Sequence, residues 1–179
     1  MMYRRIISAL LLTIATAATP AVAADNPALF GLEIGSNCDA LQSFDARLSG
    51  VSSITGGQLY EVDVSSIHFD GLRSLKVVCS QSETIAAVIA GFRKRFGGAT
   101  FDQLRAILEE DYVLEQLDEA HVGDQEAWFS HGDARILLEE PHMSRTTSLV
   151  YMTDTFNQQY EQHLREQARE REEREAGHL

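Results

Sequence analysis

Cys38 and Cys79 are the only two cysteines in the chain, and their surroundings decide what chemistry they can do. A redox-active pair requires Cys-x-x-Cys spacing, and a catalytic cysteine requires an activating histidine; neither spacing is present. In an oxidising compartment, two cysteines predicted to face one core favour a disulfide. We therefore expect a Cys38–Cys79 bridge. It would close a loop of about 42 residues and stabilise the fold by roughly 3–4 kcal/mol by the chain-entropy argument.

The other residue types that carry catalysis fall into no recognised motif. The six histidines include no His-Glu-x-x-His pair, no serine lies in a Gly-x-Ser-x-Gly turn, and Thr55-Gly56-Gly57 is too short for a phosphate loop. His121, Asp124 and Glu126 could offer three metal ligands, but acidic surface loops contain such triplets by chance. Two acids suited to glycoside hydrolysis can lie far apart in a chain, so that pairing stays open. We expect no catalytic, cofactor-binding or metal-binding residues.

A strongly acidic block is the feature that most suggests binding to another protein. Between Asp102 and Glu126 the chain has nine acidic residues and a single base, Arg105. Such a block is most often a solvated helix face. The alternative is electrostatic recognition of a cationic protein, because complementary charge steers association. The densest part of the block is the candidate interface: Glu109, Glu110 and Asp111.

Trp128 is the only tryptophan and follows the acidic block directly. It is expected either to cap the core beneath a hairpin or to serve as an exposed binding anchor, since tryptophan is enriched at interface hot spots. We include Trp128 in the candidate interface for the second reason.

The composition describes one ordinary domain with an export signal. The chain has 179 residues, 44% apolar and 23% charged, with a net charge of −12 that argues against nucleic acid or an anionic membrane as partner. Arg4 and Arg5 precede 13 mostly apolar residues and an Ala-x-Ala site, which predicts a secretory signal peptide cleaved after Ala23. Removing those two arginines leaves 13 basic against 27 acidic residues, a net charge of −14. We expect a periplasmic protein of a Gram-negative bacterium, with no membrane insertion after cleavage.

The first elements of the mature chain are predicted as a strand and a helix. Phe30 to Ile34 alternates like a half-buried strand that ends at Gly35. Ser36 and Asp39 resemble a capping box, and Gly50 would end the helix. The apolar face of this helix is expected to carry Cys38, Leu41, Phe44 and Leu48.

A hairpin is the clearest local signal. Two apolar runs flank Asp70-Gly71, which favours a two-residue type I′ turn. That turn sets Val64 opposite Val77 and Val62 opposite Cys79. The residues expected on one face are then Tyr60, Val62, Val64, Leu75, Val77 and Cys79.

The rest of the chain is predicted to contain two helices, a second hairpin, a last strand and a helical tail. Ser80 and Glu83 resemble another capping box, and the apolar residues from Ile85 to Phe96 recur at helical spacing as far as Gly97. Thr100 would cap the next helix, which the Glu109–Asp111 cluster either ends or leaves running to about Ala120. The elements expected after it are strands over 125–130, 134–139 and 148–152 and a largely solvated helix from Asp154.

Short motifs resemble those of small uncharacterised periplasmic families. Phe30-Gly31 with Gly35 gives a Phe-Gly-x-x-x-Gly opening, and later come Arg-Phe-Gly, a Trp-bearing strand and the runs Ile136-Leu137-Leu138 and Leu149-Val150-Tyr151. This pattern resembles β-lactamase-inhibitor-protein-like folds and outer-membrane-assembly small lipoproteins over about residues 29–152. It departs from them in having no lipidation cysteine and a longer, more acidic 100–126 segment. The resemblance implies a binding or assembly role and brings no catalytic residues.

These observations predict an α+β fold with one domain over residues 24–153, after the signal peptide (1–23) and before a C-terminal helix (154–179). An antiparallel meander would be packed on one face by helices that start near Asn37 and Gln81. The expected function is that of a non-enzymatic, exported binding protein of the inhibitor or immunity type, with no cofactor and a cationic periplasmic protein as partner. The alternative is an accessory protein of cell-envelope assembly or structure.

Overall fold

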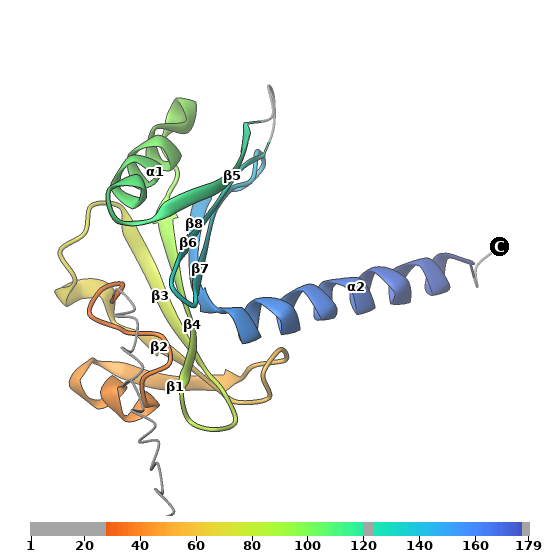
Figure 1. Ribbon diagram of the computed structural model, residues 1–179, viewed down its shortest axis with the longest axis horizontal. Helices are drawn as coiled ribbons and strands as arrows, with labels where there is room; N and C mark the ends of the chain where they lie inside the picture. The colour runs from red at the N-terminus through yellow and green to blue at the C-terminus, as the bar shows by residue number, and fades with distance from the viewer. Residues whose placement is uncertain (1–27, 120–123, 177–179) are drawn as a thin grey trace, which may run out of the picture.

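The computed structural model describes residues 28–119 and 124–176 as one eight-stranded antiparallel sheet with two α-helices (Figure 1). The fold is α+β, as the sequence predicts. The predicted signal peptide lies outside the described residues. No helix among them is long and apolar enough to cross a membrane.

The elements follow one another along the chain as strands with three short 3-10 helices and two α-helices. The 3-10 helices are η1 (Cys38–Ser43), η2 (Val64–Ser66) and η3 (Phe96–Gly98), and the α-helices are α1 (Ala99–Asp111) and α2 (Asp154–Ala176). The strands are β1 (Ala46–Val51), β2 (Gln58–Val62), β3 (Leu72–Cys79), β4 (Ile85–Arg93), β5 (Val113–Glu119), β6 (Gln125–His131), β7 (Ala134–Glu140) and β8 (Thr146–Thr153).

The strand order β1-β2-β3-β4-β8-β7-β6-β5 consists of two four-stranded meanders joined at their last strands. The chain runs from β1 to β4, crosses through η3 and α1 to the far edge, and returns from β5 to β8, which pairs with β4. Each meander is preceded by a short helix, η1 or α1. The acidic strand β5 is therefore an edge of the sheet, whereas β4 and β8 form its centre.

The two faces of the sheet are covered to different extents. On the covered face, α1 buries Phe101, Leu104 and Leu108 against strand residues such as Phe129 and Tyr151, and Leu41 of η1 joins the same cluster. On the open face, a smaller cluster of strand side chains meets only the start of α2 and the β1–β2 loop. Figure 1 shows the rest of α2 projecting away from the sheet. The large core thus lies on one side, and the other side is left accessible.

The largest correction to the sequence prediction concerns residues 85–93, which form the central strand β4 and not a helix. Neighbours pair with β4 on both sides, and eight of its nine residues are buried or half-buried. A strand that is buried on both faces shows no polar alternation, so its apolar run resembles that of a helix. Ser80 and Glu83, predicted as a capping box, instead lie in the β3–β4 turn, where the Ser80 hydroxyl accepts a hydrogen bond from the Thr84 backbone N–H.

The first hairpin has the predicted faces but a different register. Val62 pairs with Leu75 and Tyr60 with Val77, a shift of four residues from the register that a two-residue Asp70-Gly71 turn would give. The additional residues form η2 and a loop before β3. An even shift leaves each side chain on the same face. Val62, Val77 and Cys79 are therefore buried in the covered core, as predicted.

Two further predictions are corrected, and one alternative that the sequence left open is decided. Residues 30–34 form turns with an isolated Leu29–Leu32 bridge instead of a strand, although Leu32 and Ile34 are buried. The predicted first helix is the short η1, capped by Asn37, and its continuation is β1. Of the two outcomes left open for the next helix, α1 ends at Asp111 and residues 113–119 form β5. The second hairpin, the last strand and the helix from Asp154 are confirmed.

Candidate protein-binding surfaces

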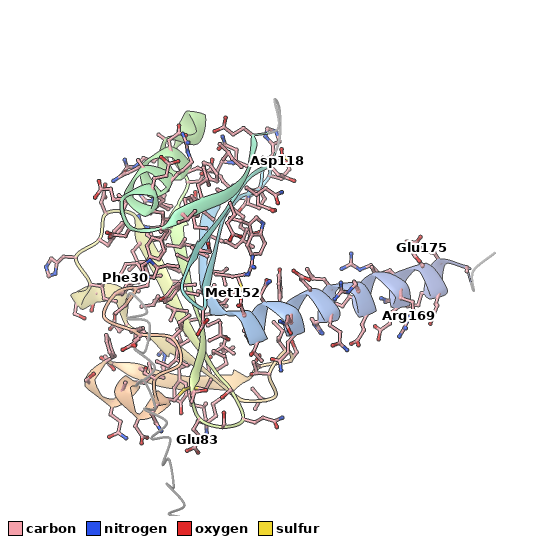
Figure 2. All side chains as sticks on the ribbon, viewed as in Figure 1. Phe30, Glu83, Asp118, Met152, Arg169 and Glu175 are labelled. Atoms are coloured by element: carbon pink, nitrogen blue, oxygen red, sulfur yellow. A yellow bond between two sulfur atoms is a disulfide. The ribbon has the colours of Figure 1, made fainter. Side chains whose placement is uncertain are left out.

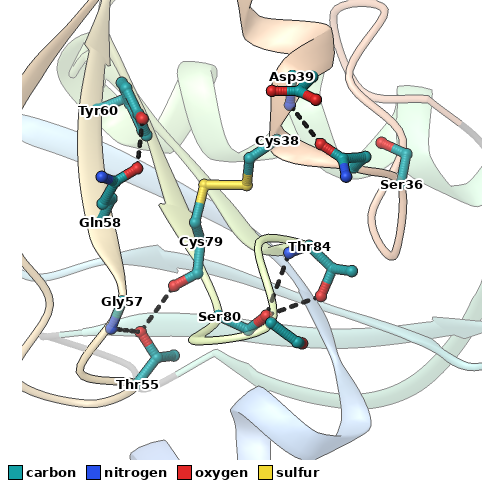
Figure 3. The surroundings of a disulfide bond; sticks show 12 residues. Ser36, Cys38, Asp39, Thr55, Gly57, Gln58, Tyr60, Cys79, Ser80 and Thr84 are labelled. Carbon is teal, nitrogen blue, oxygen red and sulfur yellow. Dashed lines mark hydrogen bonds between the residues drawn. A yellow bond between two sulfur atoms is a disulfide. The ribbon is translucent and has the colours of Figure 1, made fainter.

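The disulfide joins η1 to the end of β3 on the covered face (Figure 3). Cys38 and Cys79 are bonded with their Cα atoms 6.4 Å apart, which confirms the predicted pair. The Thr55 hydroxyl donates to the Cys79 carbonyl (2.8 Å) and accepts from the Gly57 N–H (3.1 Å). A Cβ on Gly57 would lie 2.3 Å from that carbonyl, so the loop can approach this closely only with glycine. These contacts indicate a structural role for the bridge.

The first candidate surface is the acidic edge, by which we mean β5 together with the last turn of α1. All seven residues of β5 are exposed, and β5 pairs only with β6. Its apolar side chains remain accessible: Val113 is 67% exposed, and Leu114 and Leu117 more than a third. Such an edge presents backbone N–H and C=O groups to which a further strand can pair.

Glu109, Glu110 and Asp111 form the last turn of α1, directly before β5. Negative charge at a helix C-terminus opposes the helix dipole, which favours cations there. Glu109 pairs with Arg105 (3.2 Å), and the last turn contains no base. Helix stability therefore accounts for Glu109, through its pair with Arg105, but not for Glu110 and Asp111. They add to the charge of Glu115, Asp118 and Glu119 on β5.

Trp128 does not join this surface. It is half-buried on the open face, where it packs beside Leu137, while its neighbour Phe129 points to α1 on the covered face. Its indole N–H donates to Glu126 (2.6 Å). The structure thus places Trp128 and the Glu109–Asp111 cluster on opposite faces of the sheet. It does not bring the predicted interface residues together.

A row of three carboxylates crosses the open face beside Trp128. Strand pairing sets Asp118 of β5 opposite Glu126 of β6, and Glu126 opposite Glu139 of β7. Directly opposed residues have Cβ atoms about 4.5–5.5 Å apart, and like charges in such pairs are destabilising. Burial, and then the charges of Glu126 and Asp124, raise the pKa of Glu139. We call Asp118, Glu126 and Glu139 the carboxylate row.

A hollow of about 200 Å³ lies next to this row, where α2 leaves the sheet. Its polar groups are Glu139, Ser148 and the Tyr160 hydroxyl. Burial first, and then the charges of Glu139 and Glu126, raise the pKa of Tyr160. Its apolar walls come from the sheet, from the β1–β2 loop and from α2: Ile54, Ile89, Leu137, Val150, Met152 and Phe156.

Of the three candidate metal ligands His121, Asp124 and Glu126, His121 lies outside the described residues. Asp124 accepts a hydrogen bond from the His142 N–H (2.7 Å), and Glu126 accepts from Trp128. Within residues 28–119 and 124–176, no group of three or more potential ligands is placed to hold a metal ion.

Glu139 and Tyr160 are site residues that were not predicted from the sequence. Counting the register of the second hairpin around Gly132-Asp133 would have set Glu126 opposite Glu139, since the observed pairing follows that two-residue turn. No sequence signal places Tyr160 over the same strands, because that depends on how α2 leaves β8.

Comparison with known proteins adds no assignment. No family model matches the chain, and neither the curated proteins nor the solved structures contain a significant match.

Proposed function

We propose that this chain is an exported, non-enzymatic binding protein of the inhibitor or immunity type, and that it recognises a cationic periplasmic protein through the acidic edge. The observation that carries the proposal is β5, an edge strand with all seven residues exposed and three of them acidic. A signal-like N-terminus and a disulfide support an oxidising compartment outside the cytoplasm.

The edge favours a partner of opposite charge over a second copy. An extended segment that pairs with β5 gains main-chain hydrogen bonds and covers Val113, Leu114 and Leu117. Two copies of β5 would bring their own acids together, which is unfavourable. Charged residues on an edge are also a common protection against aggregation. A segment with lysine or arginine would meet both requirements, because it pairs with the strand and neutralises its charge.

The experiment compares two variants that lose the same charge. In the edge variant, the three acids of β5 become amides: Glu115→Gln, Asp118→Asn and Glu119→Gln. In the control variant, three acids of the projecting part of α2 become amides: Glu172→Gln, Glu173→Gln and Glu175→Gln. Residues 24–179 of each are immobilised and exposed to an envelope extract from the cells that make the protein.

We expect the parent and the control to retain the same cationic protein, and the edge variant to lose it. Added salt should release it, because the Debye length falls to about 3 Å at 1 M ionic strength. A further variant with Glu109→Gln, Glu110→Gln and Asp111→Asn shows whether the contact extends onto α1. Equal retention by the edge and control variants would exclude the acidic edge as the binding surface.

A role in envelope assembly or structure is the second candidate, and α2 is the observation that favours it. Its 23 residues span about 35 Å at 1.5 Å per residue, and only its first turns contact the sheet. Figure 2 shows Arg169 and Glu175 far from the body of the protein. A projecting helix of this kind suits attachment to a larger assembly. Loss of a retained envelope protein in the α2 control variant alone would favour this role.

A further inference from the structure

The hollow on the open face combines apolar walls with an uncompensated negative charge. Glu139 lines it together with Ile89, Leu137 and Val150, and Tyr160 reaches into it from α2. Pockets that bind small molecules are mostly apolar, with a few polar groups that fix the orientation of the ligand. The charge beside this hollow therefore indicates what kind of ligand it suits.

The bases of the open face do not neutralise Glu139. Arg135 pairs instead with Glu115 (3.0 Å) and Asp154 (2.9 Å). Lys76 of β3 and Arg93 of β4 lie on the same face, opposite Ile89 and Thr146, but no base is among the groups that shift the pKa of Glu139. Among the described residues, Glu139 forms no salt bridge with a protein base. The other groups that face it are Glu126 and Asp124, both negative, the hydroxyl of Tyr160 and Ser148 of the adjacent strand. A bound cation would relieve this repulsion.

The geometry favours an organic cation over a metal ion. Neighbouring strands are about 4.8 Å apart, so the carboxylate row spreads its charge over roughly 10 Å instead of converging on one point. Aromatic rings lie beside it, since Tyr160 lines the hollow and Trp128 donates to Glu126. Aromatic faces attract ammonium groups, which a carboxylate also binds.

We propose that this hollow binds a small organic cation, with its ammonium group at Glu139 and Glu126 and its apolar body against Leu137, Val150 and Ile89. The site uses Glu139 and Glu126 of the carboxylate row, of which only Asp118 belongs to the acidic edge, and it does not depend on the β-strand contact proposed above. Its occupant is a free amine of low molecular mass, because the volume of about 200 Å³ is smaller than that of most drug-sized sites.

The test uses phenethylammonium chloride as the probe and 2-phenylethanol as its neutral counterpart, at constant ionic strength, on disulfide-bonded residues 24–179. Emission from Trp128 reports directly on the site, because this is the only tryptophan and its indole bonds to Glu126. Calorimetry provides a second readout. We expect saturable binding of the ammonium compound and binding at least tenfold weaker for the alcohol.

Two variants with the same change in charge separate the site from general electrostatics. Glu139→Gln removes the carboxylate in the hollow and should weaken binding of the ammonium compound on the order of tenfold or more. Glu170→Gln removes an exposed carboxylate from the projecting part of α2 and should leave the affinity within about twofold of the parent. If Glu139→Gln does not fold, Glu126→Gln is the second variant that removes a carboxylate from the site, and it should also weaken binding of the ammonium compound.

The parent protein supplies an independent check through pH. Protonation of Glu139 removes the charge that holds the ammonium group, so affinity should fall as the pH drops through the raised pKa of this residue. Equal affinity for the alcohol and the amine, unchanged affinity in Glu139→Gln or the absence of saturable binding would each overturn the proposal. None of these outcomes bears on the β5 contact, which is tested with a different ligand and different variants.

Discussion

The covered and open faces of the sheet are built from alternating residues of the same strands, and they differ in almost every physical respect. On β6, Phe129 points into the covered core and has no exposed surface, whereas its neighbour Trp128 is half-buried on the open face. The covered face holds the disulfide, α1 and the largest apolar cluster. The open face holds the carboxylate row and a hollow.

This difference indicates where the chain can tolerate unfavourable interactions. Three opposed carboxylates would be very costly in a closed core, because a buried charge needs a partner. Beside solvent the same row weakens the fold only modestly and creates a place for a cation. We therefore assign stability mainly to the covered face, and the open face and the acidic edge carry the two proposed binding sites.

The largest expected effect comes from Phe129, and Trp128 is its matched control on the same strand. Phe129→Ala should destabilise the protein by about 3–5 kcal/mol, since it removes a fully buried ring and leaves a cavity. Trp128→Ala should have less than half that effect, because its ring is partly solvated. Urea unfolding followed by circular dichroism measures both. Equal losses would contradict the division of the two faces.

Removing the disulfide should have the next largest effect. Cys38→Ala with Cys79→Ala should lower the free energy of unfolding by about 3–4 kcal/mol, because the bridge restricts a long loop in the unfolded chain. The parent protein should resist thiol alkylation under non-reducing conditions. Because the bridge is on the covered face, the folded variant should still bind the ammonium probe. Loss of that binding at temperatures where the variant remains folded would show that the faces are coupled.

Much of the fold could be predicted from the sequence wherever alternation marks a half-buried strand. β6 and the faces of β2 and β3 are of this kind, because one side of each meets the covered core. β7 and β8 were predicted instead as short apolar runs between polar segments, since Leu137, Val150 and Met152 pack on the open face. β4 could not be recognised, since burial on both sides removes the alternation. The register of the first hairpin depended on η2, a local turn that no turn-residue rule predicts from Asp70-Gly71.

From the sequence, the candidate sites could be predicted only as a segment rich in acidic residues and not as surfaces of the folded protein. The acidic block is visible in the sequence. In the structure it is divided among the last turn of α1, the edge strand β5 and part of the carboxylate row. This division depends on where α1 ends, which the sequence left open. The hollow requires Tyr160 of α2 to meet Glu139 of β7. That contact depends on tertiary packing, and no local spacing specifies it.

A smaller effect is expected at Glu139, and its sign depends on pH. The raised pKa means that the native state binds this proton more tightly than the unfolded chain does. The associated stability is present below the ordinary glutamate pKa of about 4.3 and is lost as the pH rises through the raised value. Glu139→Gln should therefore be more stable than the parent at neutral pH, and the difference should disappear as the pH falls below the ordinary glutamate pKa. A destabilised variant at neutral pH would show that Glu139 has a favourable partner.

The smallest effect is expected from the projecting part of α2. Deletion of residues 167–179 should change the free energy of unfolding by no more than about 0.5 kcal/mol, because surface changes away from packed contacts rarely do more. The root of the helix packs on the open face through Phe156 and Tyr160, whereas the pair Arg169–Glu173 (3.7 Å) joins side chains that are 71% exposed. Pairs of this kind contribute only about 0.3–0.5 kcal/mol each. Thermal melts of the full and shortened chains at several concentrations provide the measurement. A large, concentration-dependent loss of stability would mean that the helix joins two copies, and the open face would then be part of an assembly instead of a free surface.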